Sequence, residues 1–448
     1  MERVFIWSSF FLLLITLPAY AKGPGVKVGT KGKFHPRLYL DGGYDSNVFL
    51  RTSESVIRSN PLLSQIFGSG AINIRPGLEL DVPTKSVHFK LGGYANYSVY
   101  TEPNATNLNQ LTGKGDISLH LFPEGIVSFI IEEHFSRNSG DTTTSDDVFN
   151  RALFYYQGGA SNGGAFLSVN NRASATFLIK PGGKEGAFDI KFGYDFELGL
   201  FPDSDIDNMQ HNFRLAAKWA FFPKTALLFE TNFRLVNFTS LTTGNQSGIN
   251  RNLSPFKAYL GLLGKFTTKF ELRLKVGGGY TLVDETTGGG GLPVDNYGMV
   301  IGELDLKFNL TDKMYLRLGA RHDFHPSFFG NYYDESVASL TFAANLNRID
   351  LRISADVGYV RFGEVPATLG GVQFRVRSQT TATGNINRND IVARANLMFD
   401  YYITDFFKVG LAGRFEYRYS NLFVFSNPDF FGLGYTKIQV IFRTELAY

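Results

Sequence analysis

The sequence predicts an all-β protein: a transmembrane, antiparallel, up-and-down β-barrel of about 18 strands. Three observations predict it. Apolar and polar side chains alternate over long stretches, the connections are alternately short and long, and 48 Gly and 43 Phe accompany an absence of Cys. Without Cys there is no disulfide framework and no thiolate metal site. The formal net charge of +3 does not suggest nucleic-acid binding, which favours basic stripes.

Residues 1–21 are predicted to be a cleaved signal peptide. An apolar run from Val4 to Pro18 precedes Ala19-Tyr20-Ala21, a small-x-small cleavage pattern. The run is too short for a good transmembrane helix, and the alternative is an uncleaved anchor. We therefore expect the mature chain to leave the cytoplasm. Residues 22–36 are expected to form a short basic periplasmic segment that leaves no room for a plug domain, and residues 37–448 the barrel.

The strands are predicted from period-2 alternation. In "FELRLKVGGGYTLV", residues 270–283, Glu271, Arg273 and Lys275 share one face and apolar side chains take the other. The stretches 187–201 and 406–419 repeat this pattern. Such runs exceed the usual strand of about 5–6 residues in globular sheets. They suit tilted strands that cross a membrane, which need about 9–11 residues in the apolar layer.

The connections predict the strand number and the placement of the termini. Short turns, in which Pro, Gly, Asn and Asp supply turn geometry, are expected at 83–86, 123–125, 181–186, 223–225, 267–269, 311–313, 347–348 and 403–405. Long loops are expected at 51–69, 101–107, 139–169, 201–207, 239–253, 284–294, 327–331, 362–386 and 420–433. Together they join 18 strands, with 16 or 20 as alternatives. An even number places both termini on the short-turn side, the periplasm.

The physics of the bilayer predicts closure. Backbone polar groups in hydrocarbon must be paired, so the first strand, 37–50, is expected to pair with the last, 434–448. The tail is similar to the C-terminal assembly signal of bacterial outer-membrane proteins, carried here by Phe442, Leu446 and Tyr448. That signal usually ends in Phe, and it implies recognition by the barrel assembly machinery. We therefore expect an integral protein of the bacterial outer membrane, in contact with its lipid and lipopolysaccharide.

The polar face of the strands is expected to line a water-filled lumen, since about 18 strands enclose more space than side chains fill. Each residue there has two interpretations: a cross-strand ion pair or part of a selectivity field. The mixture of both signs argues against strong anion or cation selection. The predicted pore-lining residues are Arg75, Glu79, Lys90, Asp189, Lys191, Glu197, Arg214, Lys218, Glu230, Arg234, Glu271, Arg273, Lys275, Glu303, Asp305, Lys307, Arg317, Arg321, Asp350, Arg352, Asp356, Arg394, Lys408, Arg414, Glu416, Arg418, Arg443 and Glu445.

The longest loop, 139–169, is the candidate constriction. Its aromatic residues are costly to expose as a patch, so we expect inward packing, by analogy with the third loop of many porins. An external flap is the alternative. The residues concerned are Phe149, Phe154, Tyr155 and Tyr156.

Signals for catalysis are weak. His322 and His325 fall on opposite strand faces, which makes a poor metal pair. The acidic stretch 203–207 has Asn208 where a calcium loop needs Gly and Arg214 where it needs Glu. We expect no enzyme activity, no cofactor and no metal.

The first predicted strand carries a resemblance to a family. "LYLDGGYDSNVF", residues 38–49, contains a Tyr-Asp-x-Asn-hydrophobic pattern at Tyr44, Asp45, Asn47, Val48 and Phe49. With a large barrel behind it, this start resembles the outer-membrane β-barrel porin 2 family. Members are associated with capsule and exopolysaccharide secretion, so the resemblance implies a conduit for a polysaccharide, working with periplasmic polysaccharide-export proteins. The alternatives are a passive diffusion porin for small hydrophilic solutes and a non-transport barrel that acts as an adhesin or a sleeve.

Overall fold

The computed structural model describes residues 25–47, 68–102, 109, 111–139, 167–183, 186–200, 207–238, 251–285, 296–327, 331–366, 368–369, 372–376, 385–426, 429–432 and 434–447. The regular elements of these ranges are β-strands. None of the same residues forms a helix long and apolar enough to cross a membrane. The predicted signal peptide lies outside the described residues.

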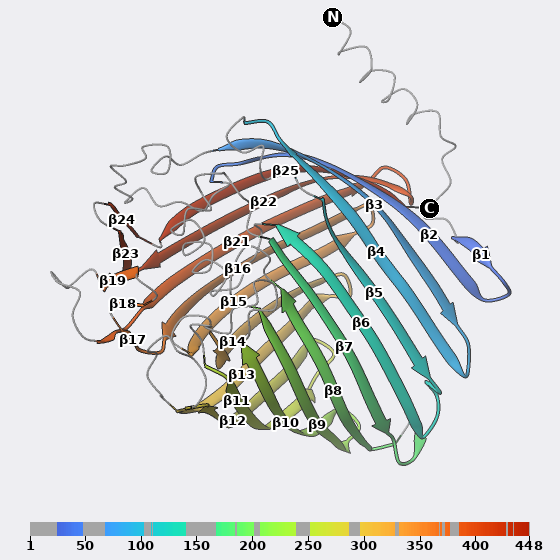
Figure 1. Ribbon diagram of the computed structural model, residues 1–448. Coiled ribbons are helices and arrows are strands. Elements are labelled where there is room, and N and C mark those ends of the chain that lie inside the picture. The colour runs from blue at the N-terminus through green and yellow to red at the C-terminus, as the bar shows by residue number, and fades with distance from the viewer. Residues whose placement is uncertain are drawn as a thin grey trace, which may run out of the picture.

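Eighteen strands form one closed antiparallel ring (Figure 1), as the sequence predicts. Each strand pairs with the next ring strand along the chain, and the last pairs with the first, so the ring is closed. The ring strands are β2 (Gly32–Asp45), β3 (Ser69–Pro83), β4 (Val87–Tyr100), β5 (Leu111–Leu121), β6 (Val127–Ser139), β7 (Leu167–Ile179), β8 (Phe188–Leu200), β9 (Asn208–Phe222), β10 (Thr225–Phe238), β11 (Leu253–Lys265), β12 (Phe270–Val283), β13 (Tyr297–Thr311), β14 (Met314–Pro326), β15 (Tyr332–Leu346), β16 (Ile349–Phe362), β21 (Asn389–Tyr402), β22 (Phe407–Ser420) and β25 (Tyr435–Ala447).

The closing seam joins β2 to β25. The register runs from Arg37 opposite Ala447 to Asp45 opposite Gln439. Phe442 lies on the outer face, 55% exposed, and Leu446 has the same parity. Tyr448, the third residue of the predicted assembly signal, lies outside the described residues. The seam confirms the pairing expected from the need to satisfy every backbone polar group.

The first strand was predicted wrongly at its start. β2 begins at Gly32 and not at 37, and β1 (Val26–Val28) pairs with its first residues. Part of the segment 22–36 is therefore sheet and not a solvated tail. Proline within a run usually marks a strand boundary, yet β2 passes through Pro36.

Two long loops were also predicted wrongly as free of strands. The loop 362–386 contains β17 (Val365–Pro366), β18 (Thr368–Leu369), β19 (Val372–Val376) and β20 (Asn385–Ile386), and the loop 420–433 contains β23 (Leu422–Ser426) and β24 (Asp429–Gly432). They form a two-stranded sheet and a four-stranded sheet beyond the ends of β16, β21 and β22 (Figure 1). In the larger sheet β19 pairs with β23, which comes from the other loop. Such pairing is invisible to local alternation.

Candidate functional site: the inner wall of the barrel

The inner face of the wall is identified by contacts between strands that are not neighbours. Lys257 on β11 donates from Nζ to Asp323 Oδ1 on β14 at 2.7 Å, although β12 and β13 lie between these strands. Side chains that far apart in a sheet meet on its concave side. Following the register from these two residues around the ring, the structure places every predicted pore-lining residue on this inner face.

Many charges of the inner face are paired with one another. Asp195 is fully buried and accepts hydrogen bonds from Arg214 at 2.7 Å and from Asn212 at 2.9 Å, with Arg172 at 3.2 Å. Further ion pairs join neighbouring strands around the ring: Arg75 with Asp41, Arg317 with Asp305, Lys275 with Glu303 (2.6 Å), Arg394 with Asp356 (2.8 Å), Lys408 with Glu445 (2.7 Å) and Lys437 with Asp45 (2.9 Å). Within these pairs the opposite charges compensate one another locally.

Sequence reasoning missed several partners in these pairs. Asp41, Asp195, Lys257, Asp323 and Glu335 lie on the inner face but are not among the predicted pore-lining residues. In the alternating pattern of each strand, these residues occupy positions of the same face as the predicted pore-lining residues. Their role becomes visible only from the contacts between strands, because each forms an ion pair with an opposite charge on another strand.

The seam recess is a hollow of about 540 Å³ in the inner wall, beside the junction of β2 and β25. Amide and hydroxyl groups line much of it. Asn96 donates from Nδ2 to Ser98 Oγ and to Thr112 Oγ1, each at 3.0 Å, and Ser98 donates to Asn73 Oδ1 at 2.7 Å. The ring of Tyr94 borders the same hollow. The seam recess therefore combines uncharged hydrogen-bonding groups and an aromatic ring with charged side chains, among them Arg75, Arg414 and Arg443.

The end of the β14–β15 hairpin separates from β13 and folds inward. β14 and β15 stay paired to Pro326 and Tyr332, whereas the pairing of β13 with β14 reaches only Gly302 and His322. Phe324 on this hairpin packs against the inner face of β12, where a Cβ on Gly279 would lie 2.2 Å from its ring. Phe324 is fully buried and its ring centroid lies 5.6 Å from that of Tyr297. We call these two strand ends, residues 323–327 and 331–335, the inward hairpin.

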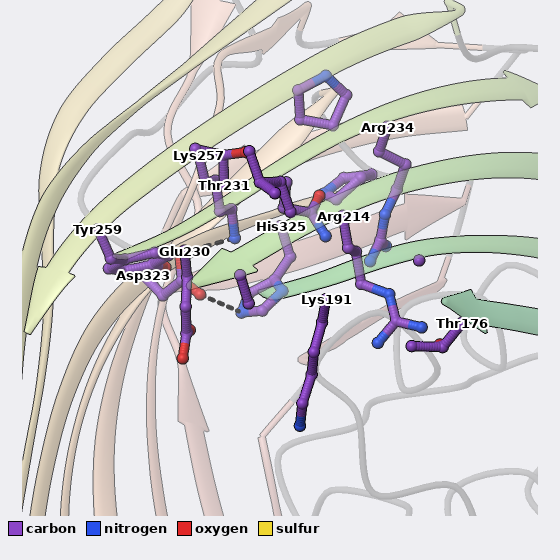
Figure 2. Close-up of a pocket in the computed structure, with 16 residues that line it drawn as sticks. Thr176, Lys191, Arg214, Glu230, Thr231, Arg234, Lys257, Tyr259, Asp323 and His325 are labelled. Atoms are coloured by element: carbon purple, nitrogen blue, oxygen red, sulfur yellow. Dashed lines mark hydrogen bonds and ion pairs between the residues drawn. The ribbon is translucent and has the colours of Figure 1, made fainter. Parts of the chain in front are cut away.

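The inward hairpin borders a second hollow of about 450 Å³, the basic recess (Figure 2). Lys191, Arg214 and Arg234 line its wall on β8, β9 and β10. Lys257 lies beside Asp323 of the inward hairpin, and the ammonium of Lys257 sits 4.5 Å from the centroid of the Phe324 ring. Charged groups thus concentrate beside the inward hairpin.

The predicted constriction cannot be compared with the structure, because residues 140–166, with Phe149, Phe154, Tyr155 and Tyr156, lie outside the described residues. The inward hairpin was not foreseen. Its one sequence signal is the run Gly277-Gly278-Gly279, since glycine within a strand often marks a close approach of other chain segments.

The histidines 322 and 325 lie apart, on the two faces of β14. His322 Nδ1 is 2.8 Å from Ser336 Oγ on the outer face, and His325 Nε2 is 3.2 Å from Glu335 Oε1 within the inward hairpin. No group of three or more His, Asp or Glu side chains positioned for a metal ion occurs among the described residues.

No protein-family model matches the chain, and no curated protein matches it. Among solved structures it is similar to the outer-membrane protein OpdK from Pseudomonas aeruginosa, with a TM-score of 0.47 and 10% identity over 93% of this chain and 99% of that one. It is also similar to OccAB3 from Acinetobacter baumannii (TM-score 0.45, 10% identity, 93% and 99% covered). A third is the siderophore receptor PirA from Acinetobacter baumannii (TM-score 0.44, 10% identity, 94% and 81% covered).

The architecture itself indicates the class of protein. A closed antiparallel ring with an even strand number, an apolar outer face and a polar inner face is the fold of outer-membrane barrels. Its wall encloses polar recesses. The fold therefore supports a channel in the outer membrane.

Proposed function

We propose that this channel carries a polysaccharide out of the cell. The observation that carries the proposal is the seam recess, where Asn96, Ser98 and Thr112 hydrogen-bond to one another beside the Tyr94 ring. A sugar chain presents many hydroxyl groups and flat apolar ring faces. Uncharged amides and hydroxyls exchange hydrogen bonds with such a ligand, and an aromatic ring packs on its faces.

The paired charges of the wall support the same cargo. Asp195 and Glu197 with Arg172 and Arg214, and Lys275 with Glu303, leave little net field to attract or repel ions. A neutral or weakly charged polymer gains from a wet wall of this kind, because it meets no strong electrostatic barrier. The Tyr-Asp-x-Asn start at Tyr44 agrees with this assignment through its resemblance to secretion barrels.

Current recordings in planar bilayers test the cargo. Oligosaccharides added to the bath should block the ionic current, and the block should shorten when Tyr94 or Asn96 is replaced by alanine. Tyr97→Ala is the matched control, because Tyr97 lies on the outer face of the same strand, 47% exposed. Oligosaccharide block that is absent in the wild type, or equal in all variants, contradicts the proposal.

A passive diffusion porin for small hydrophilic solutes is the second candidate. The basic recess favours it, because a narrowing lined by Arg214, Arg234 and Lys257 is suited to sorting small charged solutes. Deleting the gene separates the two candidates. Loss of surface polysaccharide with normal small-solute uptake supports export, and the reverse result supports the diffusion porin.

A further inference from the structure

The inward hairpin separates from β13 and leaves a gap in the barrel wall. Residues 297–301 of β13 pair with β12 but not with β14, whose pairing with β13 begins at Gly302 and His322. The backbone groups on that edge of β13 face a hollow of about 510 Å³. We call this hollow the lateral cleft. Backbone groups beside lipid need hydrogen-bonding partners, so the cleft is suited to a polar occupant.

The walls of the lateral cleft are apolar on the membrane side. Val276 and Val300 are 53% and 70% exposed and belong to the outer faces of β12 and β13. Gly298 and Gly302 have no side chains that would fill the space between them. An occupant that reaches the edge of β13 from the membrane thus passes over valine side chains.

The side chain of Arg361 supplies a positive charge to the lateral cleft. Arg361 lies on the outer face of β16, and 54% of its side chain is exposed. Its Nε donates to Asp334 Oδ2 at 2.8 Å, and Asp334 also accepts from the Tyr297 hydroxyl at 3.1 Å. One edge of the guanidinium is therefore fixed in direction by Asp334, which is almost completely buried. A guanidinium held in this way is well placed to bind a phosphate.

Polar pairs place the lateral cleft near the membrane surface. On the outer face close to Arg361, the Tyr359 hydroxyl donates to Asn389 Oδ1 at 3.1 Å, and His322 Nδ1 lies 2.8 Å from Ser336 Oγ. These pairs lie in the long-loop halves of their strands. Polar pairs are costly in hydrocarbon, so this belt marks the headgroup level of the membrane on the long-loop side.

We propose that the lateral cleft binds the phosphate group of a membrane lipid in the leaflet on the long-loop side. Arg361 meets the phosphate, the free edge of β13 supplies backbone N–H donors, and acyl chains lie over Val276 and Val300. The apolar walls favour a lipid over a free phosphate ion. This site faces away from the lumen, and it is independent of the cargo proposed above.

Native mass spectrometry of the whole barrel in detergent tests the site. The probe is a multiply acylated glucosamine disaccharide with two phosphates, beside its phosphate-free form. The wild type should retain the phosphorylated lipid at least tenfold more strongly than the phosphate-free lipid, and inorganic phosphate alone should not displace it. Arg361→Gln should remove the preference, whereas Arg137→Gln, which alters an exposed arginine on β6, should keep it.

A second variant protects the test against misfolding, because Arg361→Gln also disturbs Asp334. Val300→Glu leaves that ion pair intact and puts a negative charge at the mouth of the cleft, so it should weaken binding at least tenfold. Val357→Glu is its control, since Val357 is 57% exposed on the outer face of β16. Equal retention of both lipids, full displacement by inorganic phosphate, or equal binding by Val300→Glu and Val357→Glu overturns the proposal.

Discussion

Replacing Phe324 by alanine should release the inward hairpin. Phe324 is fully buried, packs over Gly279 and lies beside Tyr297 and the Lys257 ammonium. Removing a buried phenylalanine side chain costs about 3–5 kcal/mol in a protein interior. Because each 1.4 kcal/mol is a factor of ten, a loss of about 3 kcal/mol lowers the ratio of docked to undocked hairpin roughly a hundredfold.

Single-channel recording measures this release. Undocking widens the lumen beside the basic recess, so Phe324→Ala should raise the mean conductance and add rapid current fluctuations. Phe324→Leu, which keeps most of the apolar contact, should lie between the variant and the wild type. Leu318→Ala is the control, because Leu318 lies on the outer face of the same strand, 38% exposed.

The outcome that refutes the reasoning is specific. A folded Phe324→Ala barrel with the conductance and noise of the wild type would mean that the inward hairpin is held by other contacts or does not narrow the lumen. Far-UV circular dichroism and resistance to unfolding by detergent establish that the variant is folded. A change equal to that of Leu318→Ala would likewise remove the role assigned to Phe324.

Two further changes test the wall and its closure. Asp195→Asn leaves Arg172 and Arg214 without their shared carboxylate. The reversal potential in a salt gradient should therefore move toward anion selectivity by several millivolts or more. An unchanged reversal potential would contradict local compensation of the charges. Deleting residues 435–448 removes the strand that pairs with β2, so insertion into the outer membrane should be lost, whereas Tyr448→Phe should insert normally; fractionation of membranes checks both.

The sequence predicts the barrel well because the decisive information is local. Alternation in stretches such as 270–283 assigns each side chain to a face, and short turns mark each return of the chain. Closure follows from the requirement that no sheet edge meets hydrocarbon. The inner-face position of Arg394 or Glu445 follows from its odd or even place in the alternating strand, so the sequence alone predicts it.

The rest depends on contacts between distant segments. Pairing of β19 with β23 joins two loops, and Asp323 meets Lys257 from 66 positions away. Phe324 shows the limit most clearly. Its parity assigns it to the outer face, yet it is buried, because the inward hairpin lies as a second layer against the inside of β12. Alternation reports the face of a strand and not the layer in which the strand lies.

The inward hairpin links the lumen to the outer surface of the barrel. The same displacement that narrows the lumen opens the lateral cleft, and Asp334, on the hairpin, directs Arg361 at the cleft. If Phe324→Ala lets β14 return to the edge of β13, the cleft closes and phosphorylated lipid should bind more weakly as conductance rises. Native mass spectrometry and recording on the same preparation measure both. Higher conductance with unchanged lipid retention would show that the hairpin moves without closing the cleft, and it would separate the two properties.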